Sequence, residues 1–417
     1  MRERDVVVVG AGVGGSALAS ALAAAGLDVL ALERTEVFED RVRGEWMAPW
    51  GVAEVQALGL DGVLRAAGAH FPKRHIGYDE LAEPAAAEAR TLPLDVALPG
   101  VPGPLCLEHV RIQDALVAHA RSCGAEVLRG VATVETSPGP RPAVRWTTAD
   151  GAAHEVACRL LVGADGRASA VRRRLGIELE EAAFDTLIGG LLVRDADAWP
   201  EDAQATGKIG DIHYLVFPQG RGQVRLYAVY DARARGRFSG PDGARRFLAA
   251  FASDRVPASG VLAGASPAGP CRSYPCQDGW TDCPFAQGAV LVGDAAGYND
   301  PIIGQGLSIT LRDVRMVRDA LLGAGAWSAA IFEGYAEERR ERLRRLRFAA
   351  RFIQRLHAGF EGAALARRLH ALGVLEREPA LGLPVLQAVF AGPETVAPEW
   401  FTPAYMERVF GPGADAA

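Results

Sequence analysis

Three short segments of this chain place glycines and alanines at tight turns, two of them with a carboxylate, which is the chemistry of phosphate and hydroxyl binding. They are Gly10–Gly15, Gly163–Gly166 and Gly293–Ala296, with the sequences GAGVGG, GADG and GDAA. Glycines let a backbone approach a phosphate closely, and a helix that begins beside them presents free N–H groups to a negative charge. Each segment alone is a modest signal. Together they predict one dinucleotide site built from distant parts of the chain.

The first segment lies between a predicted strand and a predicted helix. The run Asp5–Val9 is short, apolar and β-branched, which is typical of a buried parallel strand. Gly10 permits the turn, Gly12 lets the backbone approach a pyrophosphate, and Gly15 lets the next helix pack closely on the sheet. We expect that helix from about residue 14 to residue 25.

The second predicted strand, Val29–Leu32, ends at Glu33. Dinucleotide-binding folds place an acidic residue about 20 residues after the glycines, where it binds ribose hydroxyls. A carboxylate disfavours a 2′-phosphate at this position, so the turn suggests FAD or NAD without separating the two. The stretch Val6–Leu27 has no ionisable side chain, and we interpret it as this strand and helix rather than as a signal peptide or a membrane span.

Composition indicates a globular enzyme, expected to be cytoplasmic. The chain has 417 residues, of which 49% are hydrophobic and 23% charged, and its net charge is −6. These values predict two or three domains around a large core and no general attraction to nucleic acid or anionic membrane. The scarcity of lysine and the abundance of arginine and alanine suggest a bacterial source. Six cysteines without a Cys-x-x-Cys pair predict reduced thiols and no metal site.

Two further strands are predicted to end at carboxylates. Cys158–Val162 leads to Asp165, and Ala289–Val292 leads to Asp294, which is suited to accept hydrogen bonds from a ribityl hydroxyl. Arg111 stands at the start of another predicted helix. We expect its guanidinium to reach a phosphate or the flavin, with a surface salt bridge as the alternative.

The pattern changes beyond Arg172. The runs Leu187–Val193, His213–Phe217 and Gln223–Tyr230 are typical of antiparallel strands, which would cover the cofactor and supply a substrate pocket. The preferred pocket residues are Tyr214 and Tyr227, ahead of Trp199, His213 and Tyr230. Simple packing accounts for each of these side chains equally well.

The chain beyond Gly325 is predicted to be helical. Within Tyr335–Leu356 the arginines alternate with Glu337, Glu338 and Glu341. These interleaved charges favour a solvated amphipathic helix over a surface for nucleic acid or membrane.

From residue 5 to about residue 320, the order of the segments resembles the para-hydroxybenzoate hydroxylase-like, single-component (group A) FAD-dependent monooxygenases. The resemblance rests on Gly10–Gly15, on Asp165–Arg172, and on Gly293–Ala296 followed by Pro301 and Gly304–Gly306. It departs from the family where a histidine often follows the paired alanines and an asparagine often follows the glycine-leucine pair. Here those positions hold Gly297 and Ser308.

The resemblance implies roles for individual residues. Glu33 would bind the adenosine ribose, Asp294 the ribityl chain, and Pro301 would lie against the flavin ring. The segment Gly304–Leu307 would open a helix whose N–H groups stabilise negative charge on the reduced flavin. The implied cofactor contacts are Gly10, Gly12, Gly14, Gly15, Glu33, Arg34, Arg43, Arg111, Asp165, Asp294, Gln305, Gly306 and Leu307. The residues expected to position the flavin for catalysis are Pro301, Gly304 and Gly306, with no protein nucleophile.

The implied fold is α/β, with a Rossmann-like FAD-binding domain, an inserted antiparallel substrate-binding sheet domain and a C-terminal helical region. The FAD-binding domain is expected to be discontinuous, at residues 1–78, 105–178 and 279–325. The sheet domain is expected at 79–104 and 179–278, and the helical region at 326–417.

The implied activity uses NADH or NADPH to reduce FAD, after which a flavin hydroperoxide hydroxylates or epoxidises an organic substrate. An aromatic or polyketide-like substrate is the expectation from the family, and a homodimer stays open. Three alternatives remain. A halogenase would share the first turn, but the chain has no Trp-x-Trp-x-Ile-Pro segment. A prenyl-lipid reductase is weakly suggested by Tyr214–Pro218, and a non-catalytic FAD-binding protein has no specific signal.

Overall fold

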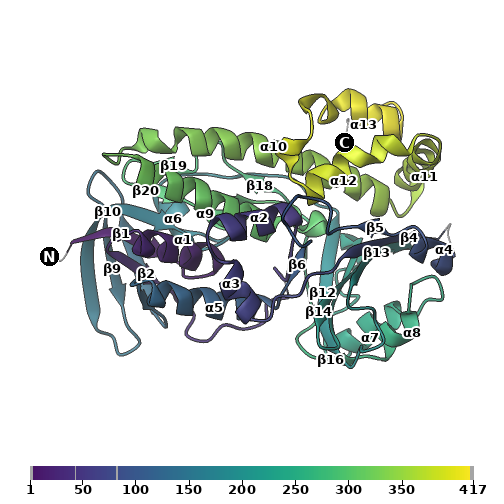
Figure 1. Ribbon diagram of the computed structural model, residues 1–417, viewed down its shortest axis with the longest axis horizontal. Helices are drawn as coiled ribbons and strands as arrows, with labels where there is room; N and C mark the ends of the chain where they lie inside the picture. Colours follow the sequence, from purple (N-terminus) through teal and green to yellow (C-terminus); the bar gives the residue numbers. More distant parts are fainter. Residues whose placement is uncertain (1–2, 43, 81–82, 414–417) are drawn as a thin grey trace.

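The computed structural model of this protein describes residues 3–42, 44–80 and 83–413. Figure 1 shows a lobe built on a mainly parallel sheet near the N-terminus and a second lobe built on an antiparallel sheet. A group of C-terminal helices lies over the second lobe (Figure 1). Both sheets combine strands that are far apart in the sequence, so the chain passes between the lobes more than once.

The first lobe contains an eight-stranded sheet. The residues of β1 from Val6 to Val9 are all buried, because other elements cover both faces of the sheet. Its parallel strands, in order across the sheet, are β20 (Ala289–Leu291), β10 (Ala153–Gly163), β1 (Glu3–Val9), β2 (Val29–Leu32) and β7 (Glu126–Leu128). The antiparallel strands are β19 (Phe285–Ala286), β9 (Ala143–Thr147) and β8 (Thr133–Ser137).

The alternation of β1 divides the core of this lobe in two. Val6 and Val8 pack on the helical side, whereas Val7 and Val9 pack with Trp146 on the opposite side. The helices of the first side are α1 (Val13–Ala24), α2 (Pro49–Ala57), α3 (Asp61–Ala66), α5 (His109–Ser122) and α9 (Gly306–Gly323). The opposite side carries the β8–β9 hairpin and the short helix α6 (Ala170–Arg174).

The second lobe contains a sheet that is antiparallel except where β4 pairs with β13. One face packs on α7 (Gly243–Ala250) and α8 (Ser259–Gly264), and the other faces the C-terminal helices. The main strands, in order, are β16 (Ser266–Pro267), β12 (Thr186–Arg194), β15 (Gln223–Asp231), β14 (Ile212–Gly220), β13 (Ala203–Ile209), β4 (Arg74–Asp79) and β5 (Leu92–Pro93). β17 (Arg272–Pro275) pairs with β12.

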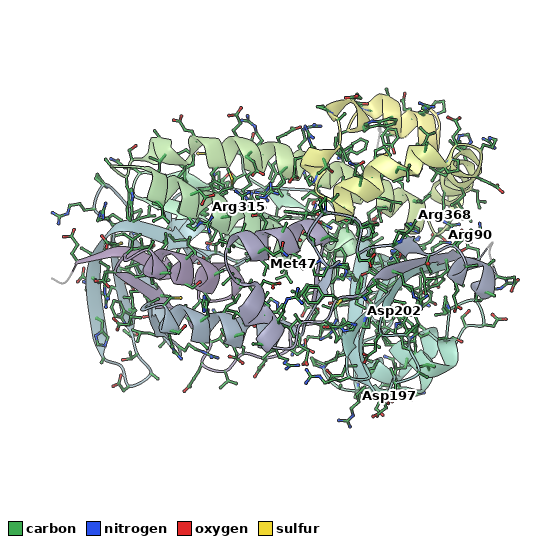
Figure 2. All side chains as sticks on the ribbon, viewed as in Figure 1. Met47, Arg90, Asp197, Asp202, Arg315 and Arg368 are labelled. Carbon is green, nitrogen blue, oxygen red and sulfur yellow. The ribbon has the colours of Figure 1, made fainter. Side chains whose placement is uncertain are left out.

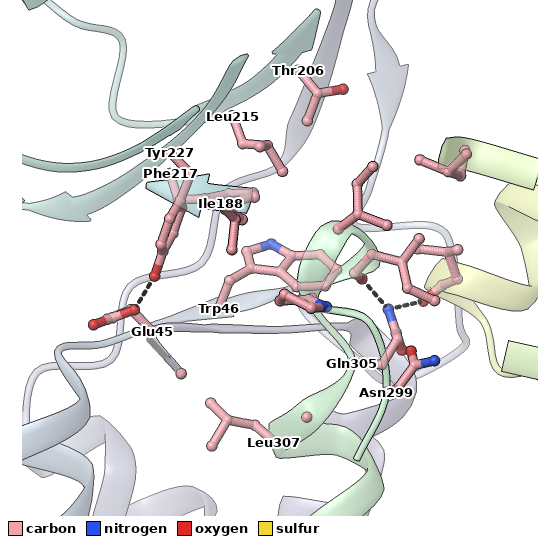
Figure 3. A pocket seen from close by; sticks show the side chains of 18 of the residues that line it. Glu45, Trp46, Ile188, Thr206, Leu215, Phe217, Tyr227, Asn299, Gln305 and Leu307 are labelled. Atoms are coloured by element: carbon pink, nitrogen blue, oxygen red, sulfur yellow. Dashed lines mark hydrogen bonds between the residues drawn. The ribbon is translucent and has the colours of Figure 1, made fainter. Parts of the chain in front are cut away.

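Short elements connect the lobes. The two-residue strands are β3 (Trp46–Met47) with β6 (Leu105–Cys106), and β11 (Glu180–Glu181) with β18 (Gly279–Trp280) and β21 (Gly297–Tyr298). The helix α4 (Pro84–Glu88) lies beside β4. β3 matters most for the site, because it brings Trp46 between the second sheet and the start of α9 (Figure 3).

The C-terminal region is helical, as expected. Its helices are α10 (Glu333–His357), α11 (Gly362–Arg377), α12 (Leu383–Phe390) and α13 (Pro403–Phe410). The long helix α10 runs from the first lobe to this group (Figure 1). Arg368 of α11 donates to Glu80 beside β4, with 2.9 Å between Nη1 and Oε1, and so ties the group to the second sheet (Figure 2).

The expected fold class is confirmed, with one difference at a boundary. Arg74–Asp79 forms a strand of the second sheet, so this sheet begins before the boundary expected at residue 79. The pairing that recruits the strand joins it to Ala203–Ile209, and such long-range pairing leaves no local signal in the sequence. Across the described part of the chain, no helix combines the length and apolar character needed to cross a membrane.

Candidate active site

A cavity of about 920 Å³ lies between the two lobes and beneath the C-terminal helices. It extends from the turn before α1 to the inner face of the second sheet. In Figure 3, Trp46 and Tyr227 lie on the side of the second sheet and Leu307 at the start of α9. The three predicted segments contribute Gly12, Val13, Gly14, Asp165, Gly166, Gly293 and Asp294 to its wall. The structure therefore brings segments that are distant in sequence to a single cavity.

The glycines of the first turn have two different roles. Gly10 has a φ of +97°, and a Cβ there would lie 2.4 Å from the carbonyl oxygen of Ala164. A Cβ on Gly15 would lie 1.9 Å from the carbonyl oxygen of Gly10, so the fold itself requires both glycines. A Cβ on Gly12 would meet only Gln113, at 3.8 Å. The space beside Gly12 belongs to the cavity, and no side chain of the described residues caps the first N–H groups of α1 there.

A second helix, α9, begins at the same cavity. The 3₁₀ helix Pro301–Ile303 leads into it, and a Cβ on Gly306 would have no atom within 4 Å. The side chain of Gln305 is engaged elsewhere: it accepts from Nε1 of Trp50 at 2.7 Å and donates to the 3₁₀ helix at 2.6 Å. Within the part of the chain that the structure describes, the first N–H groups of α9 therefore face the cavity without a side-chain cap.

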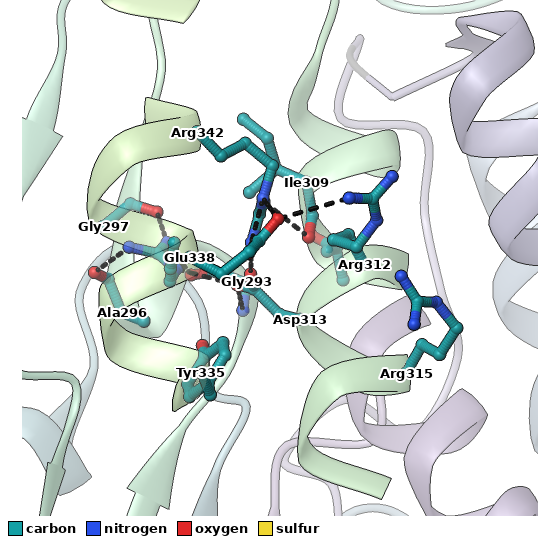
Figure 4. Close-up of polar contacts among 12 residues, drawn as sticks. Gly293, Ala296, Gly297, Ile309, Arg312, Asp313, Arg315, Tyr335, Glu338 and Arg342 are labelled. Carbon is teal, nitrogen blue, oxygen red and sulfur yellow. Dashed lines mark hydrogen bonds and ion pairs between the residues drawn. The ribbon is translucent and has the colours of Figure 1, made fainter. Parts of the chain in front are cut away.

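Buried charges hold the third segment in place. Arg339 of α10 donates to the carbonyl oxygens of Ala296 and Gly297, each at 2.9 Å. Its Nε lies 3.0 Å from Asp313 of α9, and the same carboxylate accepts the N–H of Gly293 at 2.9 Å (Figure 4). One arginine thus joins α9, α10 and the turn that follows β20.

The expectation of a solvated amphipathic helix placed the arginines of this segment in solvent, and two of them are buried. Arg339 and Arg342 are only 1% and 3% exposed, although Arg340 between them is exposed. Arg342 donates to Asp313 at 2.7 Å. The alternating charges of the sequence do not reveal this burial, because Asp313 lies on a different helix.

The predicted acidic residues support loops at the edge of the first sheet. Asp165 lines the cavity, and its carboxylate accepts the N–H of Ala170 at 2.7 Å. The carboxylate of Glu33 accepts the N–H groups of Ala11 and Thr35, both at 2.8 Å. Glu33 thereby fixes the glycine turn, and it stands behind the described cavity wall rather than in it.

The predicted arginines occupy different positions. Arg34 lines the cavity. The Nη1 atom of Arg111 lies 3.8 Å from Oε1 of Glu108. His109 and Gln113 of α5 line the cavity, whereas Arg111 does not. This arrangement matches the surface salt bridge kept open as the alternative for Arg111. Arg43 lies outside the described residues.

Strand alternation separates the two predicted tyrosines. Tyr227 lines the cavity, opposite Leu215 of the neighbouring strand. Tyr214 points to the other face of the sheet, where its hydroxyl donates to the carbonyl of Ala250 at 2.8 Å and its ring packs on Phe251. The expectation that Tyr214 lines the pocket is therefore wrong, because neighbouring residues of a strand face opposite sides. Trp199 and Tyr230 share this outer core.

A buried acid, which the sequence analysis missed, lies beside Tyr227. The phenol of Tyr227 donates to the carboxylate of Glu45, which is 1% exposed. Nη2 of Arg225 lies 3.1 Å from Glu45 and 2.8 Å from Asp40. Burial and the neighbouring Glu45 raise the pKa of Tyr227 well above its ordinary value, so the phenol stays protonated. Glu45 stands in an irregular connection, where no periodicity marks it.

The far chamber of the cavity is mostly apolar. Its wall includes Leu215, Phe217, Phe352, Leu356, Val389 and Phe390. Three histidines interrupt it, namely His75, His213 and His357. Burial lowers the pKa of His75 and of His213 to about 4 and that of His357 well below its ordinary value, so all three rings are neutral near pH 7. Of these residues, only His213 was a sequence candidate, because the others lie in segments without a motif.

The sequence matches the family described as FAD binding domain over residues 3–349. The chain belongs to this family. The match confirms the predicted resemblance to single-component flavin monooxygenases, and it makes the protein an FAD-dependent oxidoreductase.

Individual relatives differ in reaction. The chain is 28% identical over 351 residues to menaquinone reductase of Mycolicibacterium smegmatis, covering 80% of this chain and 81% of that protein. It is 26% identical over 325 residues to mitochondrial squalene epoxidase 2 of Arabidopsis thaliana, covering 76% of this chain and 54% of the relative. The anhydrotetracycline hydroxylase OxyS of Streptomyces rimosus shares the fold, with a TM-score of 0.66 and 22% identity over 93% of this chain and 76% of that one.

The described residues fit FAD. Two uncapped helix starts, at Gly12 and Gly306, border open space in one cavity, and free helical N–H groups favour phosphate and a negatively charged flavin. Asp294 lines the wall between them. At Gly297, where the family often has histidine, a Cβ would lie 2.6 Å from the carbonyl oxygen of Gly279. Close packing between β21 and β18 therefore accounts for this departure.

Proposed function

We propose that this protein is an FAD-dependent monooxygenase that uses NADH or NADPH and O2 to hydroxylate or epoxidise an unsaturated isoprenoid substrate. The observation that carries the proposal is the continuity of the cavity, which joins the two uncapped helix starts to an apolar chamber under the C-terminal helices. The names of two relatives, squalene epoxidase and menaquinone reductase, support an isoprenoid substrate. This proposal replaces the aromatic or polyketide-like expectation.

When bound and reduced, FAD supplies the activation of O2 from which one oxygen atom passes to the substrate and the other leaves as water. The residues of this chain perform the other tasks. The N–H groups at Gly12 would hold the pyrophosphate, and those at Gly306 and Leu307 would stabilise negative charge on the flavin. Pro301 and Gly304 would set the position of the ring, and Asp294 would bind the ribityl chain.

The far chamber excludes water and orients the substrate. Leu215 and Phe217 of β14 and Phe390 of α12 offer it apolar contacts. At the inner side of the chamber, the phenol of Tyr227 is already committed to Glu45, which keeps this polar pair from attracting water. A dry chamber limits the loss of reducing equivalents to peroxide.

The test combines anaerobic reduction of the purified flavoprotein by NADH or NADPH with the later admission of ¹⁸O2. Squalene, menaquinone and a polycyclic aromatic compound serve as trial substrates. We expect one of the two isoprenoids to accelerate nicotinamide oxidation and to gain one ¹⁸O atom. Product from the aromatic compound alone would overturn the substrate class, and bound FAD that neither nicotinamide reduces would overturn the self-contained reaction.

A second candidate is reduction of a carbon–carbon double bond in a prenyl lipid. It is favoured by the coverage of the relatives, because the match spans 81% of menaquinone reductase but only 54% of squalene epoxidase. The anaerobic arm of the same experiment distinguishes the two reactions. A product formed without O2 that stays two mass units heavier than menaquinone after the quinol has been reoxidised in air would establish reduction of a carbon–carbon double bond in place of oxygenation.

A further inference from the structure

We propose that Thr206 and His213 form a subsite that recognises a hydroxyl group of the substrate. The inference rests on the proposed function, because the subsite lies in the same chamber and specifies what an otherwise apolar substrate carries. Thr206 lies on the wall of the chamber, on the strand next to Leu215 (Figure 3). The donor role of Thr206 follows from the direction of a chain of hydrogen bonds that ends at its hydroxyl.

The chain begins at Trp46, whose indole N–H can only donate. It donates to Oε1 of Gln204 at 2.7 Å, which fixes the orientation of that amide. The amide nitrogen of Gln204 then faces Nδ1 of His75 at 3.2 Å and donates to it. Nδ1 of His75 is therefore the acceptor nitrogen, and the proton of the neutral ring is on Nε2.

The same direction continues to the cavity. Nε2 of His75 lies 3.2 Å from Oγ1 of Thr206, so His75 donates and the Thr206 oxygen accepts. The proton of the Thr206 hydroxyl is left to donate to a further group. Trp46, Gln204 and His75 thus orient Thr206 as a hydrogen-bond donor at the chamber wall.

His213 supplies the opposite property. Its Nδ1 lies 2.9 Å from the carbonyl oxygen of Gly207, which can only accept, so Nδ1 carries the proton. The other nitrogen, Nε2, therefore presents a lone pair, because burial keeps the ring neutral. His213 lines the chamber, and its side chain is only 2% exposed. Its Nε2 has no hydrogen-bonding partner within the described residues.

The donor and the acceptor share one face of the sheet. Thr206 pairs with Leu215, and His213 precedes Leu215 by two residues, which places Thr206 and His213 as diagonal neighbours. His357 stacks on His213 with 4.6 Å between ring centroids and closes the subsite from the side of α10. A hydroxyl group both accepts and donates, so it satisfies the pair, whereas an ether or carbonyl satisfies only Thr206.

The experiment measures binding rather than turnover. The probes are farnesol, its methyl ether and farnesene, which have the same isoprenoid chain and differ in the polar end. Dissociation constants are measured on the purified flavoprotein by tryptophan fluorescence, because Trp46 lines the cavity. We expect farnesol to bind about tenfold more tightly than its methyl ether, which lacks only the hydrogen bond to His213, the size of one well-formed hydrogen bond to a buried partner. Farnesene, which makes neither hydrogen bond, should bind more weakly still.

The variants separate the subsite from general folding. Thr206→Val is expected to weaken farnesol binding about tenfold and to leave farnesene binding unchanged. Thr206→Ser should keep the wild-type preference for farnesol over farnesene. His213→Phe is expected to equalise farnesol and its methyl ether. Tyr214→Phe is the matched control, because its hydroxyl lies on the other face of the same sheet, and it should change none of the constants.

The outcomes are distinct for the two proposals. Equal affinity of the wild-type protein for farnesol and farnesene would overturn the hydroxyl subsite and leave the proposed isoprenoid oxygenation intact. Failure of all three probes to bind would overturn the isoprenoid substrate class and, with it, this inference. An unchanged ratio between the farnesol and farnesene affinities in Thr206→Val would assign the recognition to other residues and overturn the role of Thr206.

Discussion

At the scale of single residues, the glycines of the proposed FAD site divide into those that the fold requires and those that would contact the ligand. Gly10 and Gly15 approach neighbouring backbone atoms too closely for any Cβ. Gly12 and Gly306 border the cavity, where a methyl group would meet the ligand instead of the protein. The motif in the sequence does not distinguish these two kinds of glycine, because both satisfy the same spacing.

This division predicts opposite effects of alanine. Gly12→Ala and Gly306→Ala should fold with nearly unchanged melting temperature but bind FAD about tenfold more weakly, or worse, because the methyl group displaces the cofactor. Gly15→Ala should lose about 3 kcal/mol or more of stability. The measurements are thermal unfolding of the apoprotein and the FAD retained after dialysis. Full FAD affinity in Gly12→Ala would contradict the placement of the pyrophosphate.

Asp300 gives the stability of the protein a dependence on pH. Burial raises the pKa of this carboxyl from 3.8 to about 7, although donors such as Gln354 partly oppose the shift. The folded state therefore favours the protonated form, and the stabilisation, complete below about pH 4, is lost as the pH rises through about 7. Asp300→Asn should remove this loss.

The measurement is the free energy of unfolding of both proteins from pH 4 to pH 9. The wild type should lose stability relative to Asp300→Asn between about pH 4 and 7, with a constant difference at higher pH. His75 and His213, whose lowered pKa values act in the opposite direction, are the same in both proteins and cancel in the difference. A difference that is constant throughout this range would show that Asp300 titrates normally.

At the scale of elements, local patterns predict most of the proposed FAD site. The strand before Gly10, the helix after it and the helix after Gly304–Gly306 all follow from short-range apolar spacing and turn residues. Pairing between distant segments does not follow from such patterns, so the recruitment of β4 by β13 was missed. The face of a strand is equally hidden, and Tyr214 was misplaced for that reason.

The element that departs most from its sequence pattern is α10, and a pair of neighbouring arginines tests its role. Arg339→Ala removes one of the two arginines that pair with the buried Asp313 and takes the donor away from the carbonyl oxygens of Ala296 and Gly297. This loss should cost about 3 kcal/mol of stability and weaken FAD binding. Arg340→Ala, at an exposed position on the same helix, should stay within about 0.5 kcal/mol of the wild type. Urea unfolding of both variants provides the comparison, and similar losses would mean that burial of Arg339 contributes little.

At the scale of the whole molecule, the two ends of the cavity differ in how far the sequence predicts them. The cofactor end is built by motifs that are each contiguous in the sequence, so each can be recognised from its residue spacing alone. The substrate end combines β4, β13 and β14 with α10 and α12, and single residues such as His75 and Phe390 reach it from unremarkable segments. Only the assembled tertiary structure defines that chamber.

The continuity of α10 implies that the binding of FAD and the binding of substrate are coupled. This helix has 25 residues and is ~37 Å long at 1.5 Å per residue. Arg339 hydrogen-bonds to the turn after β20, and near the other end Phe352, Leu356 and His357 line the chamber. Thermodynamic reciprocity then requires that any factor by which FAD tightens substrate binding equals the factor by which substrate tightens FAD binding. We expect farnesol to slow FAD dissociation, measured by the recovery of flavin fluorescence on dilution. An unchanged rate would mean that α10 does not couple the two sites. A slower rate would mean that FAD retention depends on whether the chamber is occupied.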